Sequence, residues 1–414
     1  MYKKMKFFVD EISKMEEIMV SKKAAGISPS PTLAIDAKFK EMKANGEDVV
    51  GFGCGEPDFD TPEHIKKAAI DAIMNGETKY TPAAGTLKLR QAVSEKFKRE
   101  NGLDYKPTDI VISNGAKHSL VNAFTAICNP GDEVIIPAPF WVSYPEMVKL
   151  ADGVPVIVNA TEENNFKVTV DELKAALTDK TKAIVINSPS NPTGMVYTED
   201  ELRAIADFAV EKNLYVISDE IYEHLIYEGK HVSIASFNEK IKDLTIVING
   251  VSKTFAMTGW RIGYAAANSQ IAKAMANVQS HASSNPNSIA QAATIAALEG
   301  GMNEVEEMKK QFKRRRDFMV EMFNSIDGVS CKRPNGAFYI MMNIDELLGR
   351  TMYGVTINDA DDFAKLFLDV AKVAVVPGTG FGVNNYVRWS YATSMDNIVE
   401  GIERLKKFLN AADI

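Results

Sequence analysis

Short apolar runs alternate with longer amphipathic stretches through the middle of the chain, between about residues 105 and 267. Seven runs have the length and composition of buried β-strands, at residues 110–112, 133–137, 154–158, 183–186, 214–217, 245–248 and 263–267. Helical spacing is clearest between them at 117–127, 198–212 and 271–280. Continuous apolar strands are typical of a sheet covered on both faces, and strand–helix alternation favours parallel crossovers. The pattern predicts an α/β domain with a mostly parallel seven-stranded sheet.

The pattern changes after about residue 304. A long, charged helical stretch comes first, followed by β-like runs at 337–342 and 373–376 and a last amphipathic helix near 397–409. This order predicts a second, smaller α+β domain at the C-terminal end.

Residues 1–23 have a pattern of their own. Apolar side chains recur at helical spacing, which predicts an amphipathic extension formed around Phe8, Ile12, Met15, Ile18 and Met19. Acidic residues at positions 10, 11, 16 and 17 interrupt the segment, so we do not interpret it as a signal peptide. Met19 is an alternative start of the chain.

Composition narrows the class of protein. Of the 414 residues, 46% are apolar and 25% charged, which is ordinary for a globular protein. The net charge of −8 disfavours a nucleic-acid partner, and the one dense basic cluster, at 313–316, is expected on the solvated face of a helix. No apolar run is long enough to span a membrane. Three distant cysteines fit a reducing cytoplasm, and neither they nor the histidines have metal-ligand spacing.

The most informative chemistry follows the run at 245–248. Lys253 lies directly after Ser252 and eight residues before Arg261. A lysine amine forms a Schiff base with an aldehyde, whereas a hydroxyl and a guanidinium bind a phosphate. Aldehyde and phosphate together describe pyridoxal 5'-phosphate, PLP. The alternative interpretation is a solvated lysine and arginine at a strand-to-loop junction.

Other residues with candidate roles in ligand binding follow the ends of the predicted strands, where open α/β sheets bind ligands. They are Gly115, Ala116 and Lys117, then Trp141, Asn191, Asp219 and Tyr222, with Arg388 near the C-terminus. In this order and spacing the set resembles the class I aminotransferases of PLP fold type I. It is most similar to the prokaryotic subgroup of aspartate aminotransferases, from about residue 27 to the C-terminus. The resemblance implies an extension at 1–26, a small domain from 27–65 and 304–414, and a large PLP-binding domain at 66–303.

The resemblance also implies roles around the cofactor ring. Lys253 is expected to form the aldimine with PLP and then to move a proton at the substrate α-carbon. Asp219 is expected to pair with the pyridine nitrogen; the alternative is a helix N-cap, because a helical-looking segment follows. Tyr222, expected on the same helical face as Asp219, and Asn191 would bind the ring's 3' oxygen. Trp141 would stack on the ring.

Further implied roles concern the phosphate and the partner subunit. Gly115, Ala116 and Lys117 are expected to offer backbone N–H groups to the phosphate, together with Ser252 and Arg261. Tyr80 matches a tyrosine that reaches the phosphate of the other subunit, so we expect a homodimer with composite sites. On local pattern alone, Tyr80 would be an ordinary loop aromatic.

The implied substrate contacts distinguish subgroups of the family. Arg388 is expected to clamp the α-carboxylate, with Gly55, Trp141 and Asn191 also in contact, and the Asn191–Pro192 bond is expected to be cis. Lys117 stands where a lysine is associated with dicarboxylate recognition, whereas Ser28 replaces a lysine associated with prephenate. In another subgroup, an arginine from the partner subunit, downstream of the Schiff-base lysine, binds the side-chain carboxylate. No arginine occurs between Arg261 and Arg314 here, so we expect that this device is absent.

The expected activity is a ping-pong aspartate:2-oxoglutarate transamination in amino-acid metabolism, in the cytoplasm. The same cofactor contacts would also serve an aromatic, alanine or methionine aminotransferase or a carbon–sulfur β-lyase, so these alternatives stay open. A non-enzymatic alternative is a regulator with an aminotransferase-like sensor domain. Such regulators carry a DNA-binding domain before the sensor, and residues 1–26 are too few and too acidic for one.

Overall fold

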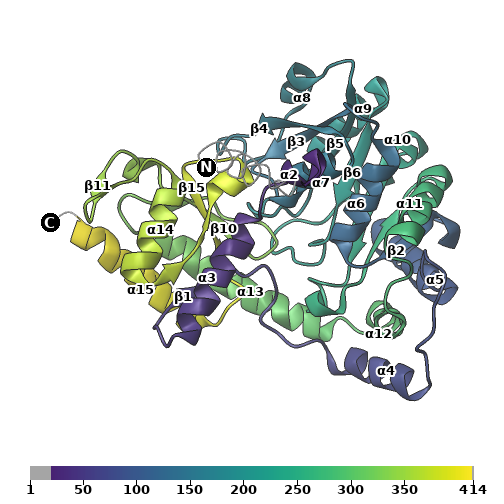
Figure 1. The fold of residues 1–414 in the computed structure, drawn as a ribbon, viewed down its shortest axis with the longest axis horizontal. Helices are drawn as coiled ribbons and strands as arrows, with labels where there is room; N and C mark the ends of the chain where they lie inside the picture. The colour runs from purple at the N-terminus through teal and green to yellow at the C-terminus, as the bar shows by residue number, and fades with distance from the viewer. Residues whose placement is uncertain (1–19, 413–414) are drawn as a thin grey trace, which may run out of the picture.

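A computed structural model of the chain describes residues 20–412. All seven predicted strands form one sheet, drawn with helices around it on the right of Figure 1. They are β2 (Ile110–Ser113), β3 (Glu133–Ala138), β4 (Val154–Asn159), β5 (Thr181–Asn187), β6 (Tyr215–Asp219), β7 (Thr245–Gly250) and β8 (Gly263–Ala266). The order is β2-β8-β7-β6-β5-β3-β4, and only β8 runs antiparallel to its neighbours. The predicted mostly parallel α/β sheet is confirmed.

The three helices predicted between strands are present as α6 (Ala116–Ile127), α9 (Glu199–Lys212) and α11 (Ser269–Ala282). A capping box between Thr198 and Glu201 starts α9, and the Asn268 side chain caps α11. The other helices of this part are α4 (Glu63–Met74), α5 (Leu87–Lys96), α7 (Ser143–Leu150), α8 (Val170–Ala176), α10 (Glu239–Leu244) and α12 (Ser288–Glu299). The central strands read as unbroken apolar runs because helices cover both of their faces.

A smaller part, on the left of Figure 1, contains a four-stranded antiparallel sheet in the order β14-β15-β10-β9. Its strands are β9 (Ser330–Cys331), β10 (Tyr339–Asn343), β14 (Val376–Pro377) and β15 (Tyr386–Ser390). The helices α13 (Asn303–Phe323), α14 (Ala360–Ala371) and α15 (Met395–Ala412) pack with this sheet around one apolar core. The hairpin of β11 (Thr351–Met352) and β12 (Val355–Thr356) lies at its edge.

At the beginning of the described chain, α2 (Lys22–Ala25) contacts the larger part, where Lys23 pairs with Asp152 beyond α7. After α3 (Pro31–Ala44), the chain joins the smaller part, and β1 (Val50–Gly51) pairs in parallel with β13 (Val373–Ala374). This arrangement agrees with the expected small α+β domain, whereas the boundaries at 27–65, 66–303 and 304–414 stay a prediction. Most of the predicted amphipathic extension at 1–23, including its apolar residues, falls on residues 1–19, outside the described residues. Within 20–412, no helix combines the length and apolar character that a membrane crossing requires.

The basic cluster at 313–316 forms the solvated helix face that we expected only in part, because Lys313 and Arg314 are exposed and Arg316 is not. It lies on α13, where Lys313 is exposed but Arg316 is completely buried. Arg316 donates to the carbonyl oxygen of Pro334 at 2.7 Å and pairs with Glu228 at 2.9 Å. The prediction was wrong for Arg316, because distant segments supply Pro334 and Glu228 as partners of its buried guanidinium.

Candidate active site

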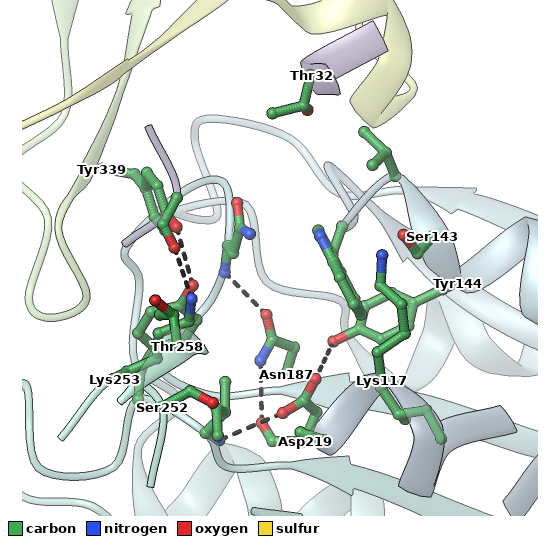
Figure 2. Close-up of a pocket in the computed structure, with 18 of the residues that line it drawn as sticks. Thr32, Lys117, Ser143, Tyr144, Asn187, Asp219, Ser252, Lys253, Thr258 and Tyr339 are labelled. Carbon is green, nitrogen blue, oxygen red and sulfur yellow. Dashed lines mark hydrogen bonds between the residues drawn. The ribbon is translucent and has the colours of Figure 1, made fainter. Parts of the chain in front are cut away.

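A cavity of about 240 Å³ lies where the carboxyl ends of β5, β6 and β7 meet the smaller part of the molecule. It collects most of the predicted site residues, several of which Figure 2 draws around it. Those on its wall are Gly55, Ala116, Lys117, Trp141, Asn191, Asp219, Tyr222, Ser252, Lys253, Arg261 and Arg388. Tyr80 is not among them; its side chain is 92% exposed at the surface. Gly115 lies directly behind Arg261.

Lys253 follows β7 and points across the cavity to the smaller part. Its Nζ donates to the carbonyl oxygen of Gly55 at 2.5 Å. Burial lowers the pKa of the Lys253 amine to about 8; Glu56 opposes this shift and the cations Arg261 and Arg388 add to it. A much larger fraction of this amine is therefore neutral at physiological pH than for an ordinary lysine, as a nucleophilic amine requires.

Asp219 is the last residue of β6 and is buried. The Tyr144 hydroxyl donates to its Oδ2 at 2.7 Å, and the backbone N–H of Ile221 donates to its Oδ1 at 3.2 Å. No basic side chain within the described residues forms an ion pair with Asp219. Burial therefore raises the pKa of its carboxyl to about 6, although both hydrogen bonds lower it.

The segment after Asp219 is not the helix that we considered. Residues 221–224 form a turn, and the chain continues to an isolated bridge between Ile226 and Gly336. Tyr222 consequently reaches the smaller part, where its hydroxyl lies 2.9 Å from the Tyr339 hydroxyl. Both the helix prediction and the N-cap alternative for Asp219 were wrong, because tertiary contacts with the smaller part set the local path.

Arg388 approaches the same cavity from β15. Its guanidinium donates through Nη1 to Asn191 Oδ1 and through Nη2 to the carbonyl oxygen of Gly53, both at 2.9 Å. The group is 2% exposed, lies 4.4 Å from the ring centroid of Tyr339 and leaves its Nε without a hydrogen-bond partner. No carboxylate in the part of the chain described here pairs with it. A buried cation with a spare donor is suited to a carboxylate ligand.

Asn191 is itself held by the end of a neighbouring strand. Its backbone N–H donates to Asn187 Oδ1 at 2.8 Å, and Asn187 Nδ2 donates to the carbonyl oxygen of Asp219 at 3.0 Å, as Figure 2 shows. The Asn191–Pro192 bond is cis, as the resemblance implies. Asn187 thus connects Asn191, and through it Arg388, to the strand that carries Asp219.

The opposite end of the cavity is suited to an anion. Gly115 has φ of 88° at the start of α6, and a Cβ there would lie 2.4 Å from Arg261 Nη2. Glycine is therefore needed for the guanidinium to lie against this turn. Arg261, with φ of 58°, donates to the carbonyl oxygen of Thr258 at 2.7 Å, and Ser252 lies on the same wall. A helix start, a hydroxyl and a guanidinium are a common phosphate site.

Lys117 and Trp141 lie side by side on the remaining wall. The Lys117 Nζ is 4.8 Å from the centroid of the Trp141 ring. Burial, with a smaller effect of Arg261, lowers the pKa of the Lys117 amine. Figure 2 shows Lys117 pointing to the side of the cavity where Ser143 lies. Among the described residues, no carboxylate pairs with this second cation.

Among the cavity residues that were not predicted, three hydrogen-bond to the predicted ones. Asn187 is the last residue of β5 and directly follows an apolar run, as several predicted site residues do. This position in the sequence could have indicated its place in the site. Tyr144 and Tyr339 have no such signal, because they act through contacts between distant segments.

The residues of the cavity fit PLP. A buried carboxylate without a cation, Asp219, suits a protonated ring nitrogen, and the partly neutral amine of Lys253 suits an aldehyde. The turn at Gly115, with Arg261 and Ser252, suits the phosphate. The fold and this site therefore define a PLP-dependent α/β enzyme.

Comparisons with known proteins identify the family. The profile of "Aminotransferase class I and II" matches residues 47–405, and the chain belongs to this family of PLP-dependent enzymes. It is 52% identical to an aspartate aminotransferase of Bacillus sp. (strain YM-2), covering 95% of this chain and 100% of that protein. The solved structure of an aspartate aminotransferase from Rhizobium meliloti is 43% identical in sequence, with a TM-score of 0.92. The match covers 95% of this chain and 99% of that one. The Thermus thermophilus aspartate aminotransferase with maleate is 44% identical with a TM-score of 0.89, covering 94% and 99%.

Proposed function

We propose that the chain is an aspartate:2-oxoglutarate aminotransferase with a ping-pong cycle. One observation carries the substrate class: two cations without carboxylate partners among the described residues, Arg388 and Lys117, line the same cavity as Lys253. A dicarboxylic amino acid offers one carboxylate to each cation and its amine to the reacting centre. The names of the relatives from Bacillus and Rhizobium meliloti support the same substrate.

When bound, PLP supplies an aldehyde that links to amines and a ring that draws electrons from the substrate α-carbon. Lys253 holds the cofactor through its amine and, once the substrate amine has replaced it, carries a proton to and from the α-carbon. Asp219 holds a proton on the ring nitrogen, and Tyr144 keeps the carboxylate oriented and ionised by its 2.7 Å hydrogen bond. Tyr222 and Asn191 would bind the ring's 3' oxygen, and Trp141 would lie against the ring.

The phosphate is held at the start of α6. The backbone N–H groups of Ala116 and Lys117 would bind it together with the Ser252 hydroxyl and the Arg261 guanidinium, whereas the expected N–H of Gly115 donates to the carbonyl oxygen of Ser113 at 2.8 Å. Because these groups come from the turns after β2 and β7, the phosphate fixes the cofactor relative to Lys253.

Substrate binding uses the cations of the cavity. Arg388 binds the α-carboxylate as a fork, with Gly55 and Asn191 beside it, and Lys117 with Trp141 binds the side-chain carboxylate. Burial of Arg388 strengthens its contact, because the surrounding dielectric is low, whereas Lys117 is more exposed.

We further propose a cytoplasmic homodimer with composite sites, without nucleic-acid or membrane partners. Support comes from the apolar side chains that α4 and the following segment expose: Ile70, Ile73, Met74 and Leu87 are all more than half exposed. Tyr80 lies on this segment and would reach the phosphate site of the partner. The net charge of −8 disfavours nucleic acid.

The test is a comparison of kcat/KM for aspartate, alanine and tyrosine with 2-oxoglutarate as acceptor. We expect aspartate to be the preferred donor. Lys117→Gln is expected to lower kcat/KM for aspartate about 10- to 100-fold and to change kcat/KM for alanine little. A wild-type protein that prefers tyrosine or alanine would contradict the proposed substrate. Pyruvate and ammonia formed from cystathionine without an oxo-acid acceptor would indicate a β-lyase instead.

A further inference from the structure

The segment from Phe52 to Thr61 connects the two halves of the cavity by its backbone. Phe52 pairs with the smaller part, its N–H donating to the carbonyl oxygen of Ala374. The next residues turn to the site: the Gly53 oxygen accepts from Arg388 and the Gly55 oxygen accepts from Lys253. The two groups that we assign to the substrate carboxylate and to the cofactor therefore share one short stretch of chain.

This stretch is not rigid by itself. Two of the three residues from 53 to 55 are glycines, which restrict the backbone less than any other residue. Its position thus depends on the contacts at both ends: Phe52 is held by Ala374 and Ser390 at one end, and the residues that follow hold the other. Glu56 accepts a hydrogen bond from the Thr258 hydroxyl, and Asp58 is bound by Arg315.

The contact between Arg315 and Asp58 is a two-pronged pair. Nη1 lies 2.7 Å from Oδ1, and Nη2 lies 3.0 Å from Oδ2. The Arg315 side chain is 11% exposed and lies over the rings of Phe59 and Phe312, so its position is fixed by packing. Bidentate, partly buried pairs of this kind hold geometry far better than exposed ion pairs.

We propose that Arg315 and Asp58 are a positioning pair for substrate binding, which anchors the 53–58 loop to α13 and thereby sets the carboxylate clamp of Arg388. The inference rests on the proposed function, since Arg388 must bind substrate. Without the anchor, the Gly53 oxygen no longer holds the guanidinium at a fixed place. The clamp serves ground state and transition state alike, so its loosening raises KM more than it lowers kcat.

The neighbouring Arg316 offers a matched control. It lies on the same helix and binds two carboxylates, those of Glu228 and Asp317, but none of its hydrogen bonds among the described residues goes to the 53–58 loop. Asp58→Asn and Glu228→Gln each replace a carboxylate by an amide of the same size opposite one of the two arginines. Only the first change releases the loop.

The experiment uses the PLP-loaded protein and its Asp58→Asn, Arg315→Lys and Glu228→Gln variants. We measure kcat and KM for aspartate, the Kd of maleate as an unreactive dicarboxylate, and the thermal midpoint. In Asp58→Asn and Arg315→Lys, KM and the maleate Kd are expected to rise about 10-fold while kcat stays within about 2-fold. Glu228→Gln is expected to leave both constants unchanged, and combining the two loop variants is expected to add little to either alone.

Unchanged KM and maleate Kd in both loop variants, whatever their thermal midpoints, would overturn the proposal and leave the pair a structural contact. Equal effects in Glu228→Gln would also overturn it. Maleate binding needs no turnover, so the maleate Kd tests the Arg315–Asp58 pair independently of catalysis. A wild-type protein that is inactive with aspartate would refute the proposed function but not the role of this pair.

Discussion

Replacement of Asp219 by asparagine is expected to stabilise the cofactor-free protein while it abolishes the proposed activity. Burial raises the pKa of the Asp219 carboxyl from 3.8 to about 6, a difference of about two units. At 1.36 kcal/mol for each unit, the ionised carboxylate costs about 3 kcal/mol in the folded state near neutral pH. Asparagine removes that cost and keeps one oxygen, which accepts from the Ile221 N–H, while its Nδ2 can donate to the Tyr144 hydroxyl in place of the second hydrogen bond.

The pH dependence follows from the direction of the shift. A carboxyl whose pKa is raised by folding stabilises the protein below pH 3.8, and this contribution is lost as the pH rises through about 6. The advantage of Asp219→Asn should therefore be about 3 kcal/mol above pH 7 and about half of that at pH 5. With PLP bound the order should reverse, because only the carboxylate stabilises a protonated ring nitrogen.

The assay is urea unfolding of both proteins, freed of cofactor, from pH 5 to 8 and then again with excess PLP. An apo Asp219→Asn protein that is less stable than the wild type at pH 8 would refute the reasoning. A stability difference that does not shrink on acidification would refute the assignment to this carboxyl.

Three further outcomes are expected from the same geometry. Tyr144→Phe removes a 2.7 Å hydrogen bond to the buried Asp219 carboxylate and thereby raises the pKa of Asp219 further. We expect PLP binding to weaken about 10-fold near pH 7, as measured by equilibrium titration. An unaltered affinity for PLP would contradict this prediction. Arg388→Lys replaces the fork by a point charge and should lower kcat/KM for all amino donors about 10- to 100-fold, so a loss confined to aspartate would argue against an α-carboxylate clamp. Capture of PLP by the apo protein needs a neutral Lys253 amine, so the rate of capture should rise as the pH passes about 8. The rate can be followed in a stopped-flow spectrophotometer. A rise only near pH 10.5 would show that the amine has an ordinary lysine pKa.

Most strands of the large sheet could be predicted because their apolar sequences are buried; β4, at the edge of the sheet, is partly exposed. An apolar run such as β7 is covered on both faces, so its composition alone indicates its position. The residues after these strands, among them Lys253, Asp219 and Asn191, could be chosen because a parallel sheet brings its carboxyl ends to one edge.

The contacts that complete the site could not be predicted in the same way. Tyr144 and Tyr339 are aromatic residues whose hydroxyls find partners 75 and 117 positions away. The burial of Arg316 likewise depends on Glu228 and Pro334, and its sequence neighbours suggested only a solvated helix. Local pattern determines which segments are buried, whereas the partner of a polar group depends on how distant segments meet.

The central claim, that Lys253 holds PLP in this cavity, has one direct test. The protein is incubated with PLP, treated with borohydride to fix any covalent link and digested, and the peptides are weighed by mass spectrometry. The account predicts one modified peptide, with the added mass on Lys253, and none in a Lys253→Ala variant. A wild-type peptide that remains unmodified, or modification spread over surface lysines only, would contradict the account.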